Sequence, residues 1–233
     1  MDKYELIRKI ESFAPIDTQE AWDCSGWLVE SEKIDVNKVM LALTITDDVF
    51  NQAQTQNCDM IISHHPLFTV PIKYRGINMY CAHTNMDLAD GGTTDSLICN
   101  MEKYGLQANN IIKPEGFVRY VETDITSDEL LNILYKISKN LRYTNIQSKK
   151  EFKKIALCAG SGSEFINEAF ENDADCFITG DLKFHTALDS PLPVFDIGHF
   201  ESEIQVLGVF ASLIGEKVEI VYAKEETPFV IYR

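Results

Sequence analysis

The stretch Met60-Ile61-Ile62-Ser63-His64-His65-Pro66 joins a short apolar run to two histidines and a proline. The apolar run predicts a buried strand, and the proline indicates that the strand stops there and that the backbone turns. Upstream, Val39–Ile45 predicts another buried strand, and Asp47–Ala53 predicts a helix start with acidic residues in its first turn. Strand, helix and strand follow one another, which is typical of an α/β fold.

The same alternation continues on both sides of this stretch. Lys3–Phe13 has the apolar spacing of an amphipathic helix. Thr126 and Glu129 have the spacing of a capping box ahead of an apolar run, so they predict another helix start. The other predicted helices are Asp95–Met101, Glu164–Phe170 and His199–Ile214, which ends at Gly215, and the other predicted strands are Met79–Ala82, Ile155–Ala159, Cys176–Thr179, Val194–Ile197, Val218–Tyr222 and Phe229–Tyr232.

These repeated units predict mixed sheets flanked by helices, with a second unit that begins near residue 120. The formal net charge of -15 disfavours sequence-independent binding to nucleic acid or to an anionic membrane. We expect a cytoplasmic protein, because the N-terminus has no apolar signal core and no stretch is long and apolar enough to span a membrane. The 6 cysteines have no C-x-x-C spacing, which favours free thiols over disulfides or a zinc knuckle.

The 5 histidines each lie in or just after the end of a predicted strand, beside Asp, Asn, Ser or Thr. Strand ends are where ligands usually bind in α/β folds. A lone histidine is more often a hydrogen-bonded core or surface residue than a metal ligand, so the inference depends on the whole set. The set is His64, His65, His83, His185 and His199.

Three clusters contain candidate metal ligands. His64 and His65 can converge only if the strand ends and the backbone turns, and alternatively each serves a different metal. Asp87 follows a predicted strand and could bridge two divalent ions, or it could form a turn or a helix cap. His199 and Glu203 are four residues apart on one predicted helix face, which suits either a metal site or a functionally silent pair.

Together the clusters supply three imidazoles and two carboxylates, and such mixed ligands suit Zn, Mn, Fe, Co or Ni better than Ca. Thr179–Asp181 with His185 forms a fourth cluster, for which a turn with a helix cap at Asp181 is the simpler interpretation. Gly160–Ser163 predicts a tight strand-to-helix turn, and Trp22–Trp27 predicts a packed loop. We predict a pair of divalent metal ions held by His64, His65, Asp87, His199 and Glu203.

Several ordered motifs extend over nearly the whole chain. They are Trp22-Asp23 with Gly26, Ser63-His64-His65-Pro66-Leu67-Phe68, His83-Thr84-Asn85-Met86-Asp87 with Gly92 and Asp95, Gly160-Ser161-Gly162, Ala174-Asp175, Thr179-Gly180-Asp181 with His185, Gly198-His199 with Ser202-Glu203, and Pro228-Phe229. With these motifs the chain resembles the Nif-three-like dinuclear-metal family, often labelled type 2 GTP cyclohydrolase I. It departs from the family pattern at Cys24, Thr44 and Thr186, where the family usually has Asn, Asp and Asp.

The resemblance implies that the five ligand positions hold two metals, with Asp87 and Glu203 able to bridge. It implies a Nif-three-like fold of two intertwined α/β lobes within a single unit, 1–233, with lobe one at approximately 1–120 plus 195–233 and lobe two at approximately 121–194. It also implies a toroidal homohexamer with metal sites that face a central cavity. None of the three departures falls on a ligand position.

Two functions fit this set of residues. The first is a metal-dependent hydrolase that acts on a nucleotide, phosphoester or cyclic amide through a water activated by the metals, with His83, His185 or Asp95 able to shuttle protons. The second is a non-catalytic scaffold, metal-delivery or regulatory protein. Turnover that tracks metal content would favour the first, and tight metal binding without turnover would favour the second.

Overall fold

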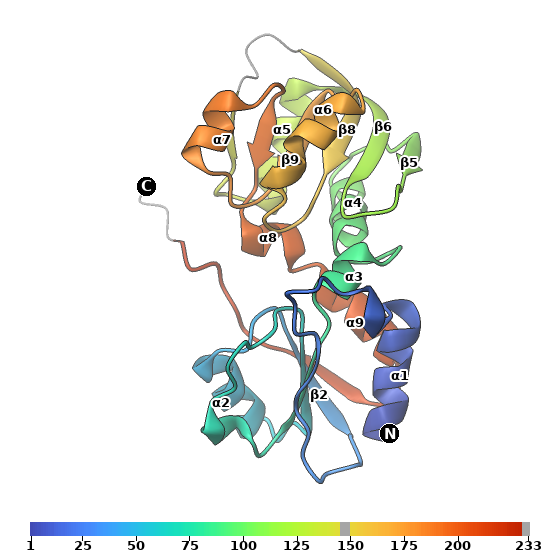
Figure 1. Ribbon diagram of the computed structural model, residues 1–233, viewed down its shortest axis with the longest axis vertical. Helices are drawn as coiled ribbons and strands as arrows, with labels where there is room; N and C mark the ends of the chain where they lie inside the picture. The colour runs from blue at the N-terminus through green and yellow to red at the C-terminus, as the bar shows by residue number, and fades with distance from the viewer. Residues whose placement is uncertain (145–149, 230–233) are drawn as a thin grey trace. The chain divides into compact units, whose positions relative to one another are not determined.

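The computed structural model describes residues 1–144 and 150–229. Contacts divide the chain into two compact units, of which the first is Met1–Gly92 with Val206–Glu226. The second is Thr93–Gln205 with the segment that starts at Thr227. Within the described residues each unit contains a mixed sheet with helices against it, as Figure 1 shows. The expected α/β fold of mixed sheets flanked by helices is therefore confirmed.

The sheet of the first unit has the strand order β1-β4-β3-β2-β11. Helices α1 (Lys3–Phe13) and α9 (Val206–Ile214) pack together, α9 also contacts β2, and α2 (Asp47–Thr55) covers the opposite face (Figure 1). The strands β2 (Lys38–Ala42), β3 (Met60–Ser63), β4 (Asn78–Cys81) and β11 (Glu219–Tyr222) run parallel, and β1 (Gly26–Val29) pairs antiparallel with β4. Three short helices, η1 (Ile16–Thr18), η2 (Ile72–Tyr74) and α3 (Thr84–Leu88), lie in its connections.

The sheet of the second unit has the strand order β5-β6-β8-β9-β10-β7. Apolar residues of α4 (Thr93–Lys103) and α5 (Ser127–Ile137) pack on one face, and those of α6 (Ile166–Glu171) pack on the other. The strands are β5 (Asn110–Ile112), β6 (Arg119–Thr126), β7 (Arg142–Tyr143), β8 (Glu151–Leu157), β9 (Cys176–Thr179) and β10 (Val194–Asp196), with β8, β9 and β10 mutually parallel. The short helices are η4 (Ser163–Phe165), α7 (Phe184–Asp189) and α8 (His199–Glu203).

The division of the chain falls after Gly92 and after Gln205, whereas the expected boundaries near 120 and 195 both lie inside the second unit. Helix α4 explains the first difference, because its apolar residues Leu97, Ile98 and Met101 join the core that also contains α5. An amphipathic helix shows in sequence which of its faces is buried, but not which sheet buries it.

Most predicted elements are present with small shifts at their ends. The capping box of Thr126 and Glu129 is confirmed at the start of α5. The prediction of one helix over His199–Ile214 is wrong, because α8 ends at Glu203 and α9 begins at Val206, each in a different unit. The sequence patterns predict no strand at β1, β5, β6 or β7 and no helix at α3.

The predicted strand Phe229–Tyr232 lies outside the described residues except for Phe229, which is not in a strand. Among residues 1–144 and 150–229, no helix combines the length and the apolar character needed to cross a membrane.

Candidate metal centre

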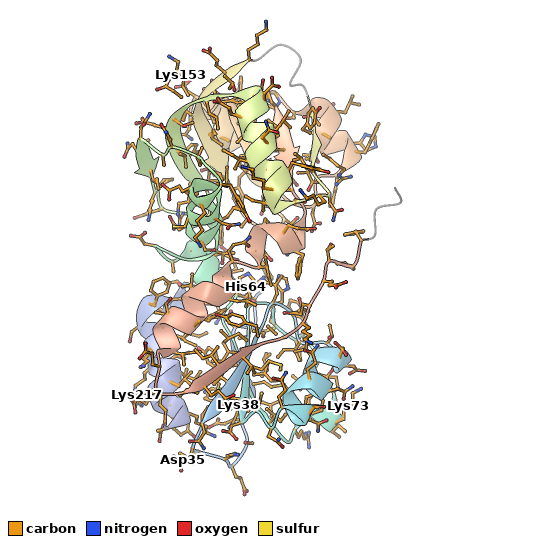
Figure 2. The ribbon with its side chains drawn as sticks, turned by 180° about the vertical axis from the view of Figure 1, so that it is seen from behind. Asp35, Lys38, His64, Lys73, Lys153 and Lys217 are labelled. Atoms are coloured by element: carbon orange, nitrogen blue, oxygen red, sulfur yellow. The ribbon has the colours of Figure 1, made fainter. Side chains whose placement is uncertain are left out.

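The parallel strands of the first unit end at one edge of its sheet, and polar side chains follow each end. Carboxyl ends of parallel strands meet at one edge, so residues far apart in sequence become neighbours there. In Figure 2, Lys38 at the start of β2 and His64 just after β3 lie toward opposite ends of the strands of this sheet. The residues at the carboxyl edge are Thr44 after β2, His64 and His65 after β3, His83 after β4, and Glu225 after β11.

His64 and His65 converge because β3 ends at Ser63 and the backbone bends. Their amides still donate to the carbonyls of Ala42 and Leu43, at 3.2 and 2.8 Å. The Ser63 hydroxyl donates to the His65 carbonyl at 2.9 Å and closes the bend. The strand ends and the backbone turns, as convergence of the two imidazoles requires, and their ring centroids are 5.1 Å apart.

His64 is fully buried, and its ring orientation is fixed by the backbone. Its Nδ1 lies 3.0 Å from the carbonyl oxygen of Ala82, which can only accept, so Nδ1 carries the proton. In the neutral ring the other nitrogen, Nε2, carries no proton, and it lies 3.4 Å from Oδ1 of Asp87. This arrangement, with one nitrogen donating to the backbone and the other facing a carboxylate, is typical of metal-binding histidines.

His65 is held through the other end of its ring. Its Nδ1 lies 2.6 Å from the hydroxyl of Thr44, one of the positions that depart from the family pattern. The half-buried carboxylate of Glu225 accepts hydrogen bonds from the amides of Leu43 and Thr44, at 2.7 and 2.9 Å. Burial raises the pKa of Glu225 despite these two amides, which act to lower it. The sequence had not indicated Glu225, which lies about 180 residues from its partners.

His83 joins the same group, although the sequence assigned it only a supporting role. One ring nitrogen from each of His64, His65 and His83 lies within 4.8 Å of the other two, a spacing at which they could hold a metal ion. The ring centroids of His83 are 5.2 and 5.6 Å from those of His64 and His65. The first unit therefore brings together three histidines and Asp87.

Asp23 orients His83, and sequence reasoning had treated its segment as a packed loop. Its buried carboxylate lies 3.0 Å from His83 Nδ1 and accepts hydrogen bonds from the hydroxyls of Ser25 and Thr84, at 2.9 and 2.5 Å. Burial would raise the pKa of Asp23, but the hydrogen bonds from Thr84 and His83 outweigh it and lower the pKa to about 2. An ionised Asp23 keeps the proton on Nδ1 of His83, which leaves Nε2 able to accept.

In the second unit the ends of β8, β9 and β10 position another group in the same way. His199 follows β10, and its Nδ1 lies 2.7 Å from Oδ2 of Asp181, which follows β9. Its Nε2 lies 2.9 Å from Oε2 of Glu203, one turn further along α8. The expected helix cap at Asp181 is wrong, because α7 has Lys183 at its N-cap position without a side-chain cap, and Asp181 contacts His199 instead.

Gly160 has a specific role beside this pair. Its amide donates to the hydroxyl of Ser202 at 2.9 Å, and its carbonyl accepts from the amide of Gly180 at 2.8 Å. A Cβ atom on Gly160 would stand 2.1 Å from Oε1 of Glu203. The glycine-rich turn predicted at 160–163 thus leaves room for the Glu203 carboxylate.

Two of the residues expected to shuttle protons lie in different surroundings. Asp95 is buried and forms ion pairs with Arg119 and Lys113, at 3.1 and 3.0 Å. His185 is exposed on α7, where its ring contacts that of Phe184. Of the three residues named for this role, His83 has the geometry that suits it best.

The metal-free protein is expected to lose stability between pH 6.5 and pH 9 because of His199. Burial opposes a charge on this ring, but the carboxylates of Glu203 and Asp181 outweigh it and raise its pKa from 6.5 to about 9. A raised pKa in the folded state contributes stability below the unfolded value of 6.5, and this contribution is lost as pH rises through 9. Urea unfolding in EDTA should show that wild type loses more stability over this range than His199→Gln. Equal losses would contradict the assignment.

The family model Duf34/NIF3 (NGG1p interacting factor 3) matches residues 1–228. A GTP cyclohydrolase 1 type 2 homolog of Clostridium perfringens is 32% identical, with 97% of each chain covered, and one of Clostridium acetobutylicum is 35% identical, with 85% of this chain and 84% of the relative covered.

Solved structures agree with this match. Reduced HcgD from Methanocaldococcus jannaschii is 28% identical with a TM-score of 0.80, covering 95% of this chain and 97% of the other. A protein from Thermus thermophilus, TTHA1606, is 24% identical with a TM-score of 0.82, covering 98% of this chain and 100% of the other, and supports the fold. The chain belongs to the Duf34/NIF3 family.

Proposed function

We propose that the chain binds two divalent metal ions and is a hydrolase that acts on a nucleotide, a phosphoester or a cyclic amide. The proposed ligands are His64, His65, Asp87, His199 and Glu203. The observation that carries the proposal is the orientation of His64, whose Nδ1 donates to a backbone carbonyl while Nε2 faces Asp87. Such an arrangement prepares a ring nitrogen and a carboxylate oxygen for the same cation.

The donor chemistry fits this proposal. Each candidate histidine has a second partner that holds its ring, namely Ala82 for His64, Thr44 for His65 and Asp181 for His199. Imidazole and carboxylate ligands suit Zn, Mn, Fe, Co or Ni. When bound, these cations would supply Lewis acidity and a source of hydroxide near neutral pH. Bound cations would also offset part of the net charge of -15 for an anionic substrate.

Among the side chains of this protein, His83 is the proposed proton acceptor. Asp23 holds its Nδ1 proton in place, so Nε2 can accept a proton from a group bound beside His64 and His65. The relatives named GTP cyclohydrolase 1 type 2 homolog support a guanine nucleotide as the first substrate to assay. Turnover that rises with metal content would support the hydrolase. Stable metal binding with no turnover on nucleotides, phosphoesters and cyclic amides would favour the scaffold or metal-delivery function instead.

Elemental analysis of protein loaded with Zn²⁺ or Mn²⁺ and then desalted is expected to give two ions per chain. Five strong ligands exceed the three or four that one zinc site normally takes from protein. A His185→Gln variant serves as a control, because His185 is exposed on α7 and lies outside the proposed ligand set, so its loss should leave the count unchanged. A firm value of one ion or none per chain would rule out the dinuclear proposal.

The proposed assembly is a homohexamer, which the family resemblance motivates. Light scattering at micromolar protein is expected to give six times the chain mass of 26.4 kDa, both at low and at high salt. Two salt concentrations are needed because subunits with a net charge of -15 repel one another when salt is low. A monomer under both conditions would reject the hexamer.

A further inference from the structure

A pocket lies in the second unit, outside the proposed metal ligands. Its volume is about 310 Å³, at the lower end of the range of about 300–1,000 Å³ that small-molecule pockets occupy. It is formed where the loop after α4 meets β6 and α5. The residues used in the argument below are Tyr104, Gln107, Thr123, Asp124, Asn132 and Lys136.

The wall of this pocket contains a buried hydroxyl without a partner. Thr123 is 3% exposed, and its Oγ1 makes no hydrogen bond to any residue in the described part of the chain. Burying an unpaired hydroxyl destabilises a fold, and buried polar groups in native proteins are nearly always paired. Valine would fill the same space without this cost. The hydroxyl is therefore explained best by a partner that comes from outside the chain.

The backbone at Thr123 is irregular in a way that supports this interpretation. Glu122 pairs with Lys154 and Ile125 pairs with Phe152, so β6 has one more residue than β8 in this interval. Such bulges redirect side chains and are frequent beside functional sites. Ile125, whose side chain belongs to the core against α5, lines the same pocket as Thr123.

The remaining side chains indicate the chemical class of the ligand. Gln107 and Asn132 are exposed, and within the described residues their amides make no hydrogen bond to protein, so each can both donate and accept. Tyr104 adds a ring that is 39% exposed. Lys136, whose Nζ lies 5.9 Å from the centre of that ring, is the basic side chain of the lining, and Asp124 and Glu129 are its acidic ones. The Glu129 carboxylate already accepts hydrogen bonds from Thr126, and the acidic excess disfavours an anionic ligand.

Neutral groups that both donate and accept are matched best by hydroxyl groups, which do the same, and an aromatic ring suits the apolar face of a sugar. We propose that this pocket binds a neutral polyhydroxylated molecule of monosaccharide size, with the Thr123 hydroxyl as one of its partners. The pocket is independent of the metal chemistry proposed above, so either proposal can fail without the other.

Saturation-transfer NMR with D-ribose and D-glucose tests the site, with inorganic phosphate added as a charged competitor whose binding is detected by loss of the sugar signal. Wild type is expected to bind at least one of the two sugars in preference to phosphate, with or without EDTA. Thr123→Val should bind that sugar about tenfold more weakly, because a ligand hydroxyl then loses its partner. The same variant should have a higher unfolding temperature without sugar, because an unpaired buried hydroxyl has been removed.

Two further variants guard against a general effect of substitution. Asn132→Ala on α5 should weaken sugar binding several-fold, whereas Asn51→Ala, at an exposed position of α2, should leave it unchanged. The proposal is overturned if neither sugar binds wild type, if phosphate binds in their place, or if Thr123→Val binds sugar as well as wild type does. In each of those cases a water molecule is the simplest partner for the hydroxyl.

Discussion

Asp87→Ala is expected to remove at least one divalent ion from the metal-loaded protein and to abolish any hydrolytic turnover. Oδ1 of Asp87 lies 3.4 Å from Nε2 of His64, so this carboxylate is the acidic ligand proposed in the first unit. Two divalent cations at short range repel strongly where the dielectric constant is low, and a bridging carboxylate offsets that repulsion. Metal content and activity, measured on the same preparation, check the expectation.

The fold should survive this substitution. The Asp87 side chain is 21% exposed and lies on the short helix α3, and alanine is the residue most favourable to a helix. Circular dichroism should therefore match wild type, which separates metal loss from unfolding.

His185→Ala is the matched control, because this histidine is exposed on α7 and should leave both ions in place. If Asp87→Ala keeps two ions and full activity, the ligand assignment is wrong. If His185→Ala removes metal instead, the site is centred on the loop between Thr179 and His185.

The positions of most candidate ligands in the fold could be predicted from sequence because local signals mark them. A short apolar run followed by polar residues and proline shows where β3 ends, and the i, i+4 spacing shows that His199 and Glu203 share a helix face. The same strand ends also indicated that candidate residues would lie at the carboxyl edges of sheets. These signals depend on a few neighbouring residues, so a single sequence contains them.

The supporting residues could not be predicted because their partners are distant in the chain. Asp23 forms a hydrogen bond with His83, which lies 60 residues away in sequence. Glu225 accepts a hydrogen bond from the amide of Thr44, at a sequence separation of 181 residues. Nothing local to Asp23 distinguishes a ligand-orienting carboxylate from one in an ordinary loop. The break between α8 and α9 could not be predicted for a related reason. The apolar spacing continues through Ile204, although the two helices belong to different units.

Glycine positions show the same limit at the level of single atoms. The Gly160–Ser163 segment was correctly expected to turn sharply, since Gly160 has a φ of 68°, in the left-handed region that glycine favours. The sequence could not show that the missing side chain at Gly160 also makes room for a carboxylate 43 residues later, at Glu203. Such a requirement is visible only when both segments are placed in space.

Gly160→Ala is therefore expected to remove metal binding at His199 and Glu203 while most of the fold persists. The new methyl group would stand 2.1 Å from Oε1 of Glu203, so the carboxylate must move away. That oxygen is the far end of a side chain, so its displacement requires no movement of the backbone, although it breaks the contact with His199. The left-handed backbone adds roughly 1–2 kcal/mol. Metal affinity should fall by at least about tenfold, since a displaced ligand no longer contributes.

Gly116→Ala separates backbone strain from displacement of the Glu203 carboxylate, which act together in the Gly160→Ala variant. Gly116 also has a positive φ, 119°, but a Cβ there would meet no atom within 4 Å. Its alanine variant should lose stability through backbone strain and keep its full metal content, whereas Gly160→Ala should lose stability and metal together. Titration with Zn²⁺ against a competing chelator, together with urea unfolding of the metal-free proteins, measures both quantities. Equal zinc affinity in the two variants would show that Glu203 is not a ligand, because a carboxylate forced from its place would then have left the metal undisturbed.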